Sequence, residues 1–337
     1  MGGDFGPESV VPGAALALKA RADLHFLIFG DEARIQPLLD RNPALMSAST
    51  LIHTDKMIHS DDKPSNILRA SKGTSMRLAI ESVQTGQALA VVSSGNTGAL
   101  MALAKLVLKP LHGIHRPALA SILPAQGGET VMLDLGANVL VDAESLVQFA
   151  VLGAVFAKLH KKIERPTVGL LNVGSEEMKG PEHVREAGQI LSRISFPGIY
   201  KGFVEGNDIT QGTVDVVVCD GYAGNIALKS IEGVGKLTRY YFKKFMTHNL
   251  LGILGSLIAY CSLKNFKDKL DPRRYNGGVF LGLNGICIKS HGGTDPVGFA
   301  RAIHLAAELA TQGYIDEVAR DINRLMNQES FVSQGIS

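Results

Sequence analysis

Five turns in this chain combine glycine with asparagine, aspartate, lysine or histidine, and each follows a short apolar run. They are Ser94–Gly98, Asp134–Asn138, Asn172–Gly180, Asp220–Asn225 and His291–Thr294. Glycine lets the backbone approach a ligand closely, and asparagine offers donors and acceptors without charge. Lysine adds positive charge, and histidine can exchange a proton near neutral pH. These residue types predict a site for a phosphate-like group, which backbone N–H groups at helix N-termini also favour.

The apolar runs before these turns have the length of strands, and helical patterns follow most of them. The runs are Ala88–Val92, Thr130–Leu133, Val168–Leu171, Val214–Cys219 and Gly285–Lys289. Alternating strands and helices predict an α/β fold with a mostly parallel sheet flanked by helices. We expect the turns to gather at the carboxyl edge of that sheet, where open α/β folds bind ligands.

One long segment interrupts the alternation of strands and helices. Residues Gly224–Asp271 form a nearly continuous helical pattern with a break near Thr247–Asn249. We find neither a low-complexity linker nor a repeat of fixed period. We therefore expect a single domain over residues 1–327, including this helical part, and a polar tail at 328–337.

Each turn residue also has a purely structural interpretation. Asparagine is a common turn former, because it tolerates the left-handed region. Bare carboxylates at Asp134 and Asp220 would repel phosphate, so we expect them to orient neighbouring N–H groups or lysines. A paired acid–base role for them is the lesser alternative. Coincidence is the weaker explanation for all five turns, since unrelated turns need not bring compatible groups together.

Composition and missing motifs exclude several classes of function. The net charge of +2 and the absence of tryptophan argue against a nucleic-acid partner. Fingerprints of nucleotide-triphosphate hydrolysis, dinucleotide binding, serine hydrolysis and zinc proteolysis are missing. Three scattered cysteines suit a reducing compartment, and we expect Cys219 to be a buried structural thiol. No signal-peptide pattern is visible, so we expect a cytoplasmic protein. The cysteine spacing shows no zinc-binding pattern, and we expect neither a metal nor a cofactor.

The segment Leu250–Leu263 holds fourteen residues without a formal charge and has lysines on both sides. It is too short to span a bilayer. One interpretation is a core or dimer-interface helix. The other is a helix lying on an anionic membrane, because lysines are attracted to such surfaces. On a helix its apolar face would include the candidate membrane contacts Leu250, Leu254, Leu257 and Ile258.

At these motifs the chain closely resembles the bacterial phosphate acyltransferases of phospholipid synthesis, the acyl-acyl carrier protein (acyl-ACP):phosphate transacylases. The matching pieces run nearly end to end in the family's order. They are MGGDFGP at Met1–Pro7, SSGNTGALM at Ser93–Met101, LDLGANV at Leu133–Val139, LLNVGSEEMKG at Leu170–Gly180, VVVCDGYAGNIALK at Val216–Lys229, and YNGGVFLGLNG through KSHGG at Tyr275–Gly293. Family members usually carry a strand before MGGD, so an earlier start or a missing sheet edge is expected.

The resemblance implies that long-chain acyl-ACP and inorganic phosphate give acyl phosphate and ACP. The product would feed a glycerol-3-phosphate acyltransferase at the inner face of the membrane, where the protein would associate peripherally. The resemblance also implies a homodimer and a fold like those of phosphotransacetylases and isocitrate or isopropylmalate dehydrogenases. In that fold the helical part at about 236–272 would protrude.

Our hypothesis divides the turn residues between the two substrates. Phosphate is itself a nucleophile, so the protein needs to hold it near the thioester carbonyl and stabilise the oxyanion. We assign phosphate binding to Asn96, Thr97, Asn138 and Lys179. The catalytic candidates are Asn225, Lys229 and His291 near the carbonyl or thiolate, and Asp220. Candidates for a basic face toward the acidic ACP are Lys236, Arg239, Lys243 and Lys244.

Three alternatives remain open from the sequence. A short-chain phosphotransacetylase would use acyl-CoA, and the apolar segment argues mildly against it. A pyridine-nucleotide dehydrogenase on a related sheet would need a dinucleotide site, whose glycine fingerprint is absent. A non-catalytic, membrane-recruited module would bind its ligand without turnover. A phosphate-dependent assay of acyl transfer separates all of them.

Overall fold

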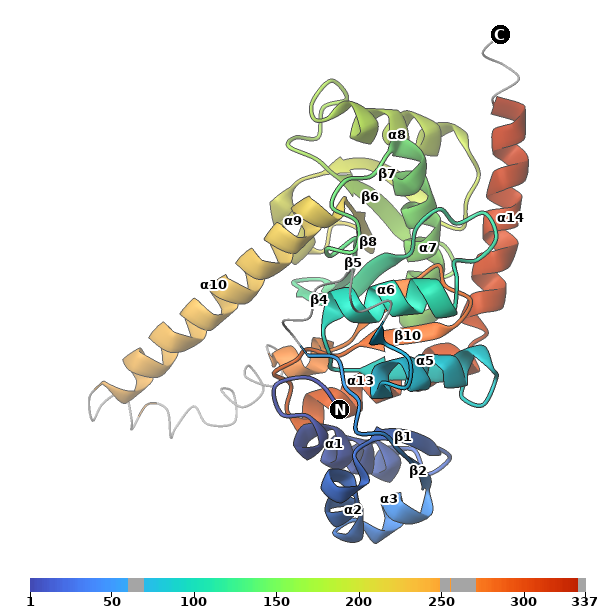
Figure 1. Cartoon of the computed structure of the whole chain (residues 1–337). Coiled ribbons are helices and arrows are strands. Elements are labelled where there is room, and N and C mark those ends of the chain that lie inside the picture. Colours follow the sequence, from blue (N-terminus) through green and yellow to red (C-terminus); the bar gives the residue numbers. More distant parts are fainter. Residues whose placement is uncertain (60–69, 249–254, 256–270, 333–337) are drawn as a thin grey trace.

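Each of the five apolar runs before the glycine turns forms a strand, as predicted. In the computed structural model, which describes residues 1–59, 70–248, 255 and 271–332, they are β3 (Ala90–Ser93), β5 (Gly128–Leu133), β6 (Thr167–Leu171), β8 (Val216–Val218) and β10 (Ile286–Lys289). They join β4 (Ala118–Ala125), β7 (Ile199–Val204) and β9 (Gly278–Leu281) in one sheet. The strand order is β3-β10-β9-β4-β5-β8-β6-β7, and helices cover the sheet (Figure 1).

The sheet is mostly parallel at its two ends and antiparallel in the middle. Strand β10 pairs parallel with β3, and β5, β8, β6 and β7 pair parallel with one another. The strand pairs β10–β9, β9–β4 and β4–β5 are antiparallel. Strands β3 and β10 therefore run opposite to β5, β8 and β6. The expected single carboxyl edge for all five turns is wrong, because these antiparallel pairings reverse the chain direction within the sheet.

The strand register nevertheless brings the five turns together. Successive Cα partners form one row across the sheet, namely Val92, Ile288, Val279, Ala120, Leu133, Val218 and Leu170. The strands that precede the five turns all end at this row or one residue beyond it. Between β10 and β5 lie only β9 and β4, a distance of about 14 Å at the usual strand spacing. The turns after β3 and β10 therefore reach this row from one side, and the turns after β5, β8 and β6 reach it from the opposite side.

Alternation along the strands gives the sheet two apolar faces. Val131 and Leu133 of β5 join one core cluster, whereas Met132 joins the other. The first cluster includes residues of α7 (Ala143–Lys161), α8 (Glu182–Arg193), α13 (Pro296–Thr311) and α14 (Tyr314–Val332). The second includes residues of α5 (Ser75–Gln84), α6 (Thr97–Val107) and α9 (Gly206–Gln211). Both faces of the sheet are therefore covered by helices.

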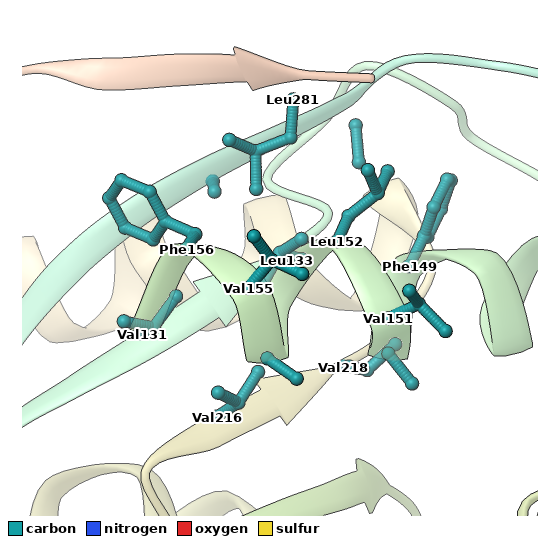
Figure 2. Packing of buried hydrophobic residues seen from close by; sticks show 14 of the residues in the cluster. Val131, Leu133, Phe149, Val151, Leu152, Val155, Phe156, Val216, Val218 and Leu281 are labelled. Atoms are coloured by element: carbon teal, nitrogen blue, oxygen red, sulfur yellow. The ribbon is translucent and has the colours of Figure 1, made fainter. Parts of the chain in front are cut away.

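Helix α7 lies at the centre of the first cluster. Phe149, Val151, Val155 and Phe156 are at most 1 % exposed, and the helix packs over β5 and β8 (Figure 2). At Gly153 an added Cβ would lie 2.7 Å from Val216 Cγ1, so the helix and strand approach closely at this point. This packing fixes the strands that carry two of the glycine turns.

The N-terminal region forms a small unit beside the large sheet. It contains α1 (Pro7–Ala20), β1 (Phe26–Gly30), α2 (Glu32–Asp40), α3 (Pro43–Ser47) and β2 (Ser49–His53). Strands β1 and β2 pair in parallel, and Val11 and Ala14 of α1 pack with Phe299 of α13. At the bottom of Figure 1 this unit lies next to α13. It brings the first residues of the chain to the turn before α13.

Helix α10 (Gly221–Thr247) extends away from the sheet, as the yellow helix of Figure 1 shows. It confirms the first part of the predicted long helix. Leu237, Tyr241 and Phe245 on its outer part are 55 %, 59 % and 75 % exposed, so this helix presents apolar side chains to solvent. The predicted membrane contacts Leu250, Leu254, Leu257 and Ile258 lie outside the described residues.

A histidine whose side chain is only 7 % exposed lies between two glutamates and links α7 to its neighbours. His160 Nε2 lies 3.0 Å from Glu129 Oε2, and its Nδ1 lies 3.7 Å from Glu308 Oε2. Burial alone would lower the pKa of His160, but the hydrogen bond to Glu129 and the charge of Glu308 outweigh it and raise the pKa to about 9. The charged imidazole therefore stabilises the folded state.

This pKa predicts a stability change at alkaline pH. Because the folded pKa lies above the unfolded value of about 6.5, the stabilisation is complete below that pH and is lost as the pH rises through about 9. We expect His160→Gln to lower the free energy of unfolding by about 2–3 kcal/mol at pH 6 and by much less at pH 10. Urea titration of both proteins at the two pH values measures this difference. An equal difference at both would contradict the charge-based account.

Candidate active site

Three turns meet at the ends of β3 and β10. The Asp4 N–H donates to Gly292 O at 2.9 Å, and Ser94 Oγ donates to Gly2 O at 3.2 Å. A Cβ on Gly2 would lie 3.2 Å from Gly95 Cα, so these backbones pack directly against each other. The first residues of the chain thus complete a site formed by the Ser94–Gly98 and His291–Thr294 turns.

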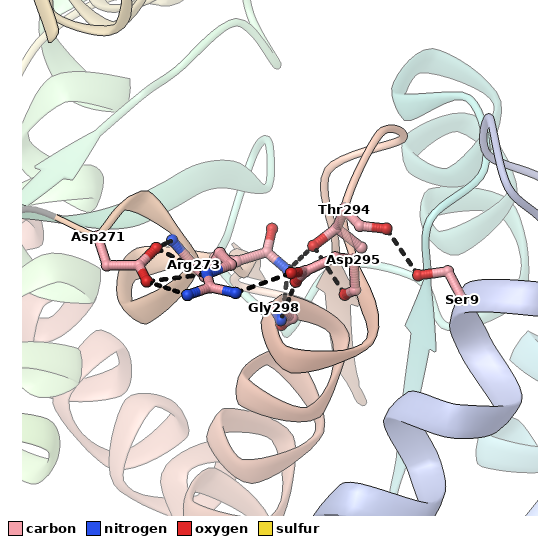
Figure 3. Close-up of polar contacts among 7 residues, drawn as sticks. Ser9, Asp271, Arg273, Thr294, Asp295 and Gly298 are labelled. Atoms are coloured by element: carbon pink, nitrogen blue, oxygen red, sulfur yellow. Dashed lines mark hydrogen bonds and ion pairs between the residues drawn. The ribbon is translucent and has the colours of Figure 1, made fainter. Parts of the chain in front are cut away.

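Several polar contacts anchor the His291–Thr294 turn. The amide of Asn276 donates to Ser290 Oγ at 2.8 Å, and its Oδ1 accepts the His291 N–H at 2.9 Å. The Thr294 carbonyl accepts Ser9 Oγ–H at 2.6 Å, as Figure 3 shows. In the same view the Arg273 guanidinium bridges Asp271 and the α13 cap Asp295. The turn is therefore held from both sides.

The predicted residues of these two turns have distinct positions. Asn96 caps α6 by accepting the Ala99 N–H at 2.9 Å, and Thr97 is exposed at the first position of that helix. His291 is exposed, and its Nδ1 accepts the Gly293 N–H at 3.3 Å. The structure thus brings Asn96, Thr97 and His291 to the same part of the molecule.

Lys289, which the sequence hypothesis did not include, lies at the same place. It is the last residue of β10, and its Nζ donates to Ser290 O and lies 3.5 Å from Ser94 O. Burial lowers its pKa to about 8, the charge of Asp4 opposes this effect, and the charge of Lys229 adds to it. In the sequence, the position of this lysine at the end of the apolar run Ile286–Lys289 could have identified it as a candidate site residue.

The second part of the site is the turn after β5, built around the buried carboxylate of Asp134. Its Oδ1 accepts the N–H groups of Leu119 and Ala137 at 3.0 and 2.9 Å. Its Oδ2 accepts the N–H and the side-chain amide of Asn138 at 2.7 and 2.8 Å. Burial raises the pKa of Asp134, and these hydrogen bonds oppose the rise. Asp134 therefore orients N–H groups, as its sequence position predicted.

The same bonds define the role of Asn138 in this structure. Its Nδ2 donates to Pro117 O at 2.8 Å as well as to Asp134, and the residue is only 6 % exposed. A phosphate contact from this amide would require one of these bonds to break. Here Asn138 positions the turn.

The start of α10 packs on that turn. Asp220 caps the helix by accepting the Ala223 N–H at 2.7 Å, and Gly221 N–H donates to Asn138 O at 2.8 Å. The exposed Asn225 lies beside Gly136, where an added Cβ would be 3.5 Å from Asn225 Cβ. The turns after β5 and β8 therefore form one unit.

The other predicted lysines are exposed. Lys229 Nζ pairs with Glu232 at 2.9 Å, and Lys179 Nζ pairs with Glu176 at 2.7 Å. Lys179 lies on the turn after β6, whose neighbouring helix brings His183 Nε2 to 3.9 Å from Asp220 Oδ2. Lys236, Arg239, Lys243 and Lys244 are exposed on α10. The structure thus links the Asn172–Gly180 turn to the others through His183, which the sequence hypothesis also omitted.

The described cysteines are unsuited to nucleophilic chemistry. Cys219 and Cys287 are buried, and burial raises the pKa of both thiols. Cys219 Sγ donates to Leu133 O at 3.1 Å, so it is a structural thiol, as predicted. In the described ranges we find no group of three or more histidine, cysteine, aspartate or glutamate residues that could hold a metal ion. No described helix is long and apolar enough to cross a membrane.

The folded chain resembles two phosphotransacetylases of known structure. The enzyme from Streptococcus pyogenes has a TM-score of 0.61 and 18 % identity, with 91 % of this chain and 92 % of that chain covered. EutD phosphotransacetylase from Staphylococcus aureus has a TM-score of 0.58 and 17 % identity, with 88 % and 89 % covered. At these identities the likeness concerns the fold alone, and it confirms the predicted fold class.

Sequence comparison identifies the family. The profile of a family described as "Fatty acid synthesis protein" matches residues 1–317. The phosphate acyltransferase of Parvibaculum lavamentivorans is 52 % identical over 326 residues, 96 % of this chain and 90 % of that protein. The phosphate acyltransferase of Rhodospirillum centenum is 52 % identical over 325 residues, 96 % of this chain and 92 % of that protein. The chain therefore belongs to the phosphate acyltransferases, a family of acyl-transferring enzymes in fatty acid synthesis.

Proposed function

We propose that the protein transfers the acyl group of long-chain acyl-ACP to inorganic phosphate, releasing acyl phosphate and ACP. The observation that carries this proposal is the membership of the phosphate acyltransferase family over almost the whole chain. The site is consistent with it, because its turns supply glycine, asparagine, lysine and histidine, and both described thiols are buried. The acyl acceptor is then the phosphate, without an acyl-enzyme intermediate.

The reaction proceeds by addition and elimination at the thioester carbonyl. A phosphate oxygen forms a bond to the carbonyl carbon, and the carbonyl oxygen takes the negative charge of the tetrahedral intermediate. The C–S bond then breaks, and the thiolate of the carrier leaves and is protonated. An unperturbed thiol has a pKa of about 8.5, so this thiolate is a moderate leaving group. The protein lowers the barrier by positioning both substrates and stabilising the oxyanion.

An assay of acyl phosphate formation tests the proposal. Protein, palmitoyl-ACP and inorganic phosphate are mixed, and hydroxylamine traps the acyl phosphate as a hydroxamate. We expect phosphate-dependent loss of palmitoyl-ACP. A preference for acetyl-CoA would instead support a short-chain phosphotransacetylase, and a lack of turnover with both would contradict the proposal.

We further propose that the acyl phosphate is consumed by a glycerol-3-phosphate acyltransferase in phospholipid synthesis. The protein would then work in the cytoplasm at the inner face of the membrane. Support comes from the uncharged run Leu250–Leu263 with its flanking lysines, and from exposed apolar side chains on the outer part of α10. Such a combination favours a membrane surface. A homodimer is part of the same proposal, and a mass of one chain by light scattering would contradict it.

Changes in the uncharged run should release the protein from lipid. We expect Leu254→Glu/Leu257→Glu to abolish most cosedimentation with vesicles containing anionic lipid, because burying a carboxylate in the apolar interface is costly. Leu89→Glu is the control, since this residue is 75 % exposed in the loop before β3. Unchanged vesicle binding by the folded double variant would refute the membrane assignment.

A further inference from the structure

Lys289 is a half-buried cation, and its partial burial is the main cause of its lowered pKa. It lies where the turns Gly2–Gly6, Ser94–Gly98 and His291–Thr294 converge. An ammonium group has three N–H donors. The acceptors found for it in the described residues are the carbonyl oxygens of Ser290 and, at 3.5 Å, Ser94. The site therefore holds a positive charge with donor capacity left for a ligand.

The charges around Lys289 come from two other elements. Asp4, on the N-terminal turn, favours the protonated ammonium, and Lys229, on α10, disfavours it. The carboxylate of Asp4 lies over the glycines of the β10 turn, since a Cβ on Gly293 would be 2.9 Å from Asp4 Oδ2. With a pKa of about 8, Lys289 is mainly protonated at neutral pH and becomes neutral at mildly alkaline pH.

We propose that inorganic phosphate binds at the junction of these three turns, with the Lys289 ammonium group donating to its oxygens and Asp4 acting as a positioning residue that keeps this ammonium charged. The inference rests on the proposed function, which requires a phosphate subsite. The charge of Lys229, on α10, acts on Lys289, but its own Nζ is exposed and paired with Glu232, so Lys289 carries the main positive charge of this subsite.

Lys289 replaces Lys179, the residue expected from the sequence, as the main lysine for phosphate binding. Lys179 has 52 % of its side chain exposed and is paired with Glu176, so water screens its charge. Lys289 is half-buried, and a charge-assisted hydrogen bond is stronger where water is partly excluded. We therefore expect the loss of Lys289 to weaken phosphate binding more than the loss of Lys179 does.

Binding of inorganic phosphate alone, measured by isothermal titration calorimetry on the full chain, provides the first test. We expect Lys289→Met to weaken phosphate about 10- to 100-fold at pH 7, as typical for loss of a charge-assisted hydrogen bond. Lys179→Ala should have a smaller effect. Lys201→Met, at an exposed position on the edge strand β7, is the matched control and should bind as the wild type does. Wild-type affinity in folded Lys289→Met would overturn the proposal.

The pH dependence of phosphate binding separates a direct role from a structural one. Wild-type affinity should fall as the pH rises through about 8. Asp4→Asn should move this fall to lower pH, and Lys229→Gln should move it to higher pH. Lys289→Arg should remove the fall, because arginine stays charged. Binding that strengthens through pH 8, or charge variants that leave the fall in place, would overturn the proposal.

Binding and activity measurements on Lys289→Met distinguish the phosphate subsite from the reaction. If phosphate binding depends on Lys289 but no acyl phosphate forms from palmitoyl-ACP, the subsite stands and the proposed reaction fails. If acyl phosphate forms and Lys289→Met leaves the KM for phosphate unchanged, the reaction stands and the subsite assignment fails.

Discussion

Gly224→Ala is expected to displace the start of α10 and to reduce acyl transfer by at least tenfold. An added Cβ at this position would lie 1.9 Å from Asp134 O and 2.9 Å from Cys219 Sγ. Neither atom belongs to a flexible side-chain end, so the helix must move away from the turn after β5. Overpacking of this kind costs about 1–3 kcal/mol or more. Asn225 and Lys229, on the first turns of the same helix, would move with it.

Another glycine of the same helix provides the control. At Gly233 an added Cβ has no neighbour within 4 Å. Gly233→Ala should therefore raise the free energy of unfolding by about 0.5–1 kcal/mol through helix propensity, and leave activity unchanged. Urea denaturation and the hydroxamate assay on both variants measure the contrast. Equal behaviour of the two would show that the close approach at Gly224 is unimportant.

Asp134→Asn is expected to be the most destabilising nearly isosteric change in the site. The two carboxylate oxygens of Asp134 accept four N–H bonds, and asparagine would replace one oxygen by a donor. Two buried donors would then lack an acceptor, at about 1–3 kcal/mol each, so we expect a loss of about 2–6 kcal/mol in the free energy of unfolding. The turn that carries Asn138 would lose two of the hydrogen bonds that Asp134 accepts.

The matched control for that change is an exposed aspartate. Asp23 pairs with Arg21 at the surface, with 65 % of its side chain exposed, and Asp23→Asn should change stability by no more than about 0.5 kcal/mol. Thermal unfolding of the three proteins gives the comparison. A loss below 1 kcal/mol for Asp134→Asn would mean that the turn rearranges and recovers its hydrogen bonds.

The sequence predicted the strands and the glycine turns well because both have local causes. Apolar runs such as Thr130–Leu133 have the length and composition of buried strands, and glycine marks where they end. The role of Asp134 as an orienter of N–H groups also followed from its position directly after a strand. The start of α13 also has a local cause, because Asp295 caps the helix and Pro296 occupies its first position.

Local patterns in the sequence could not predict the direction of the strands or the role of Lys289. Antiparallel pairing of β9 and β4 depends on contacts between residues 118–120 and 279–281, which no local pattern encodes. Lys289 reads as the polar end of a strand until the N-terminal turn is placed beside it. Short elements such as α3 and α9 span too few residues for a helical period to be recognised.

The contact between Asp4 and Gly292 has a consequence for the order in which the protein becomes active during its synthesis. Asp4 and its hydrogen-bond partner Gly292 are 288 positions apart, so the Asp4 turn is synthesised well before that partner. Ribosomes add roughly 5–20 residues per second, so the first residues wait on the order of tens of seconds for that partner. The junction of the three turns then assembles as one of the last steps, and a nascent chain cannot form it before β10 and the turn after it have emerged.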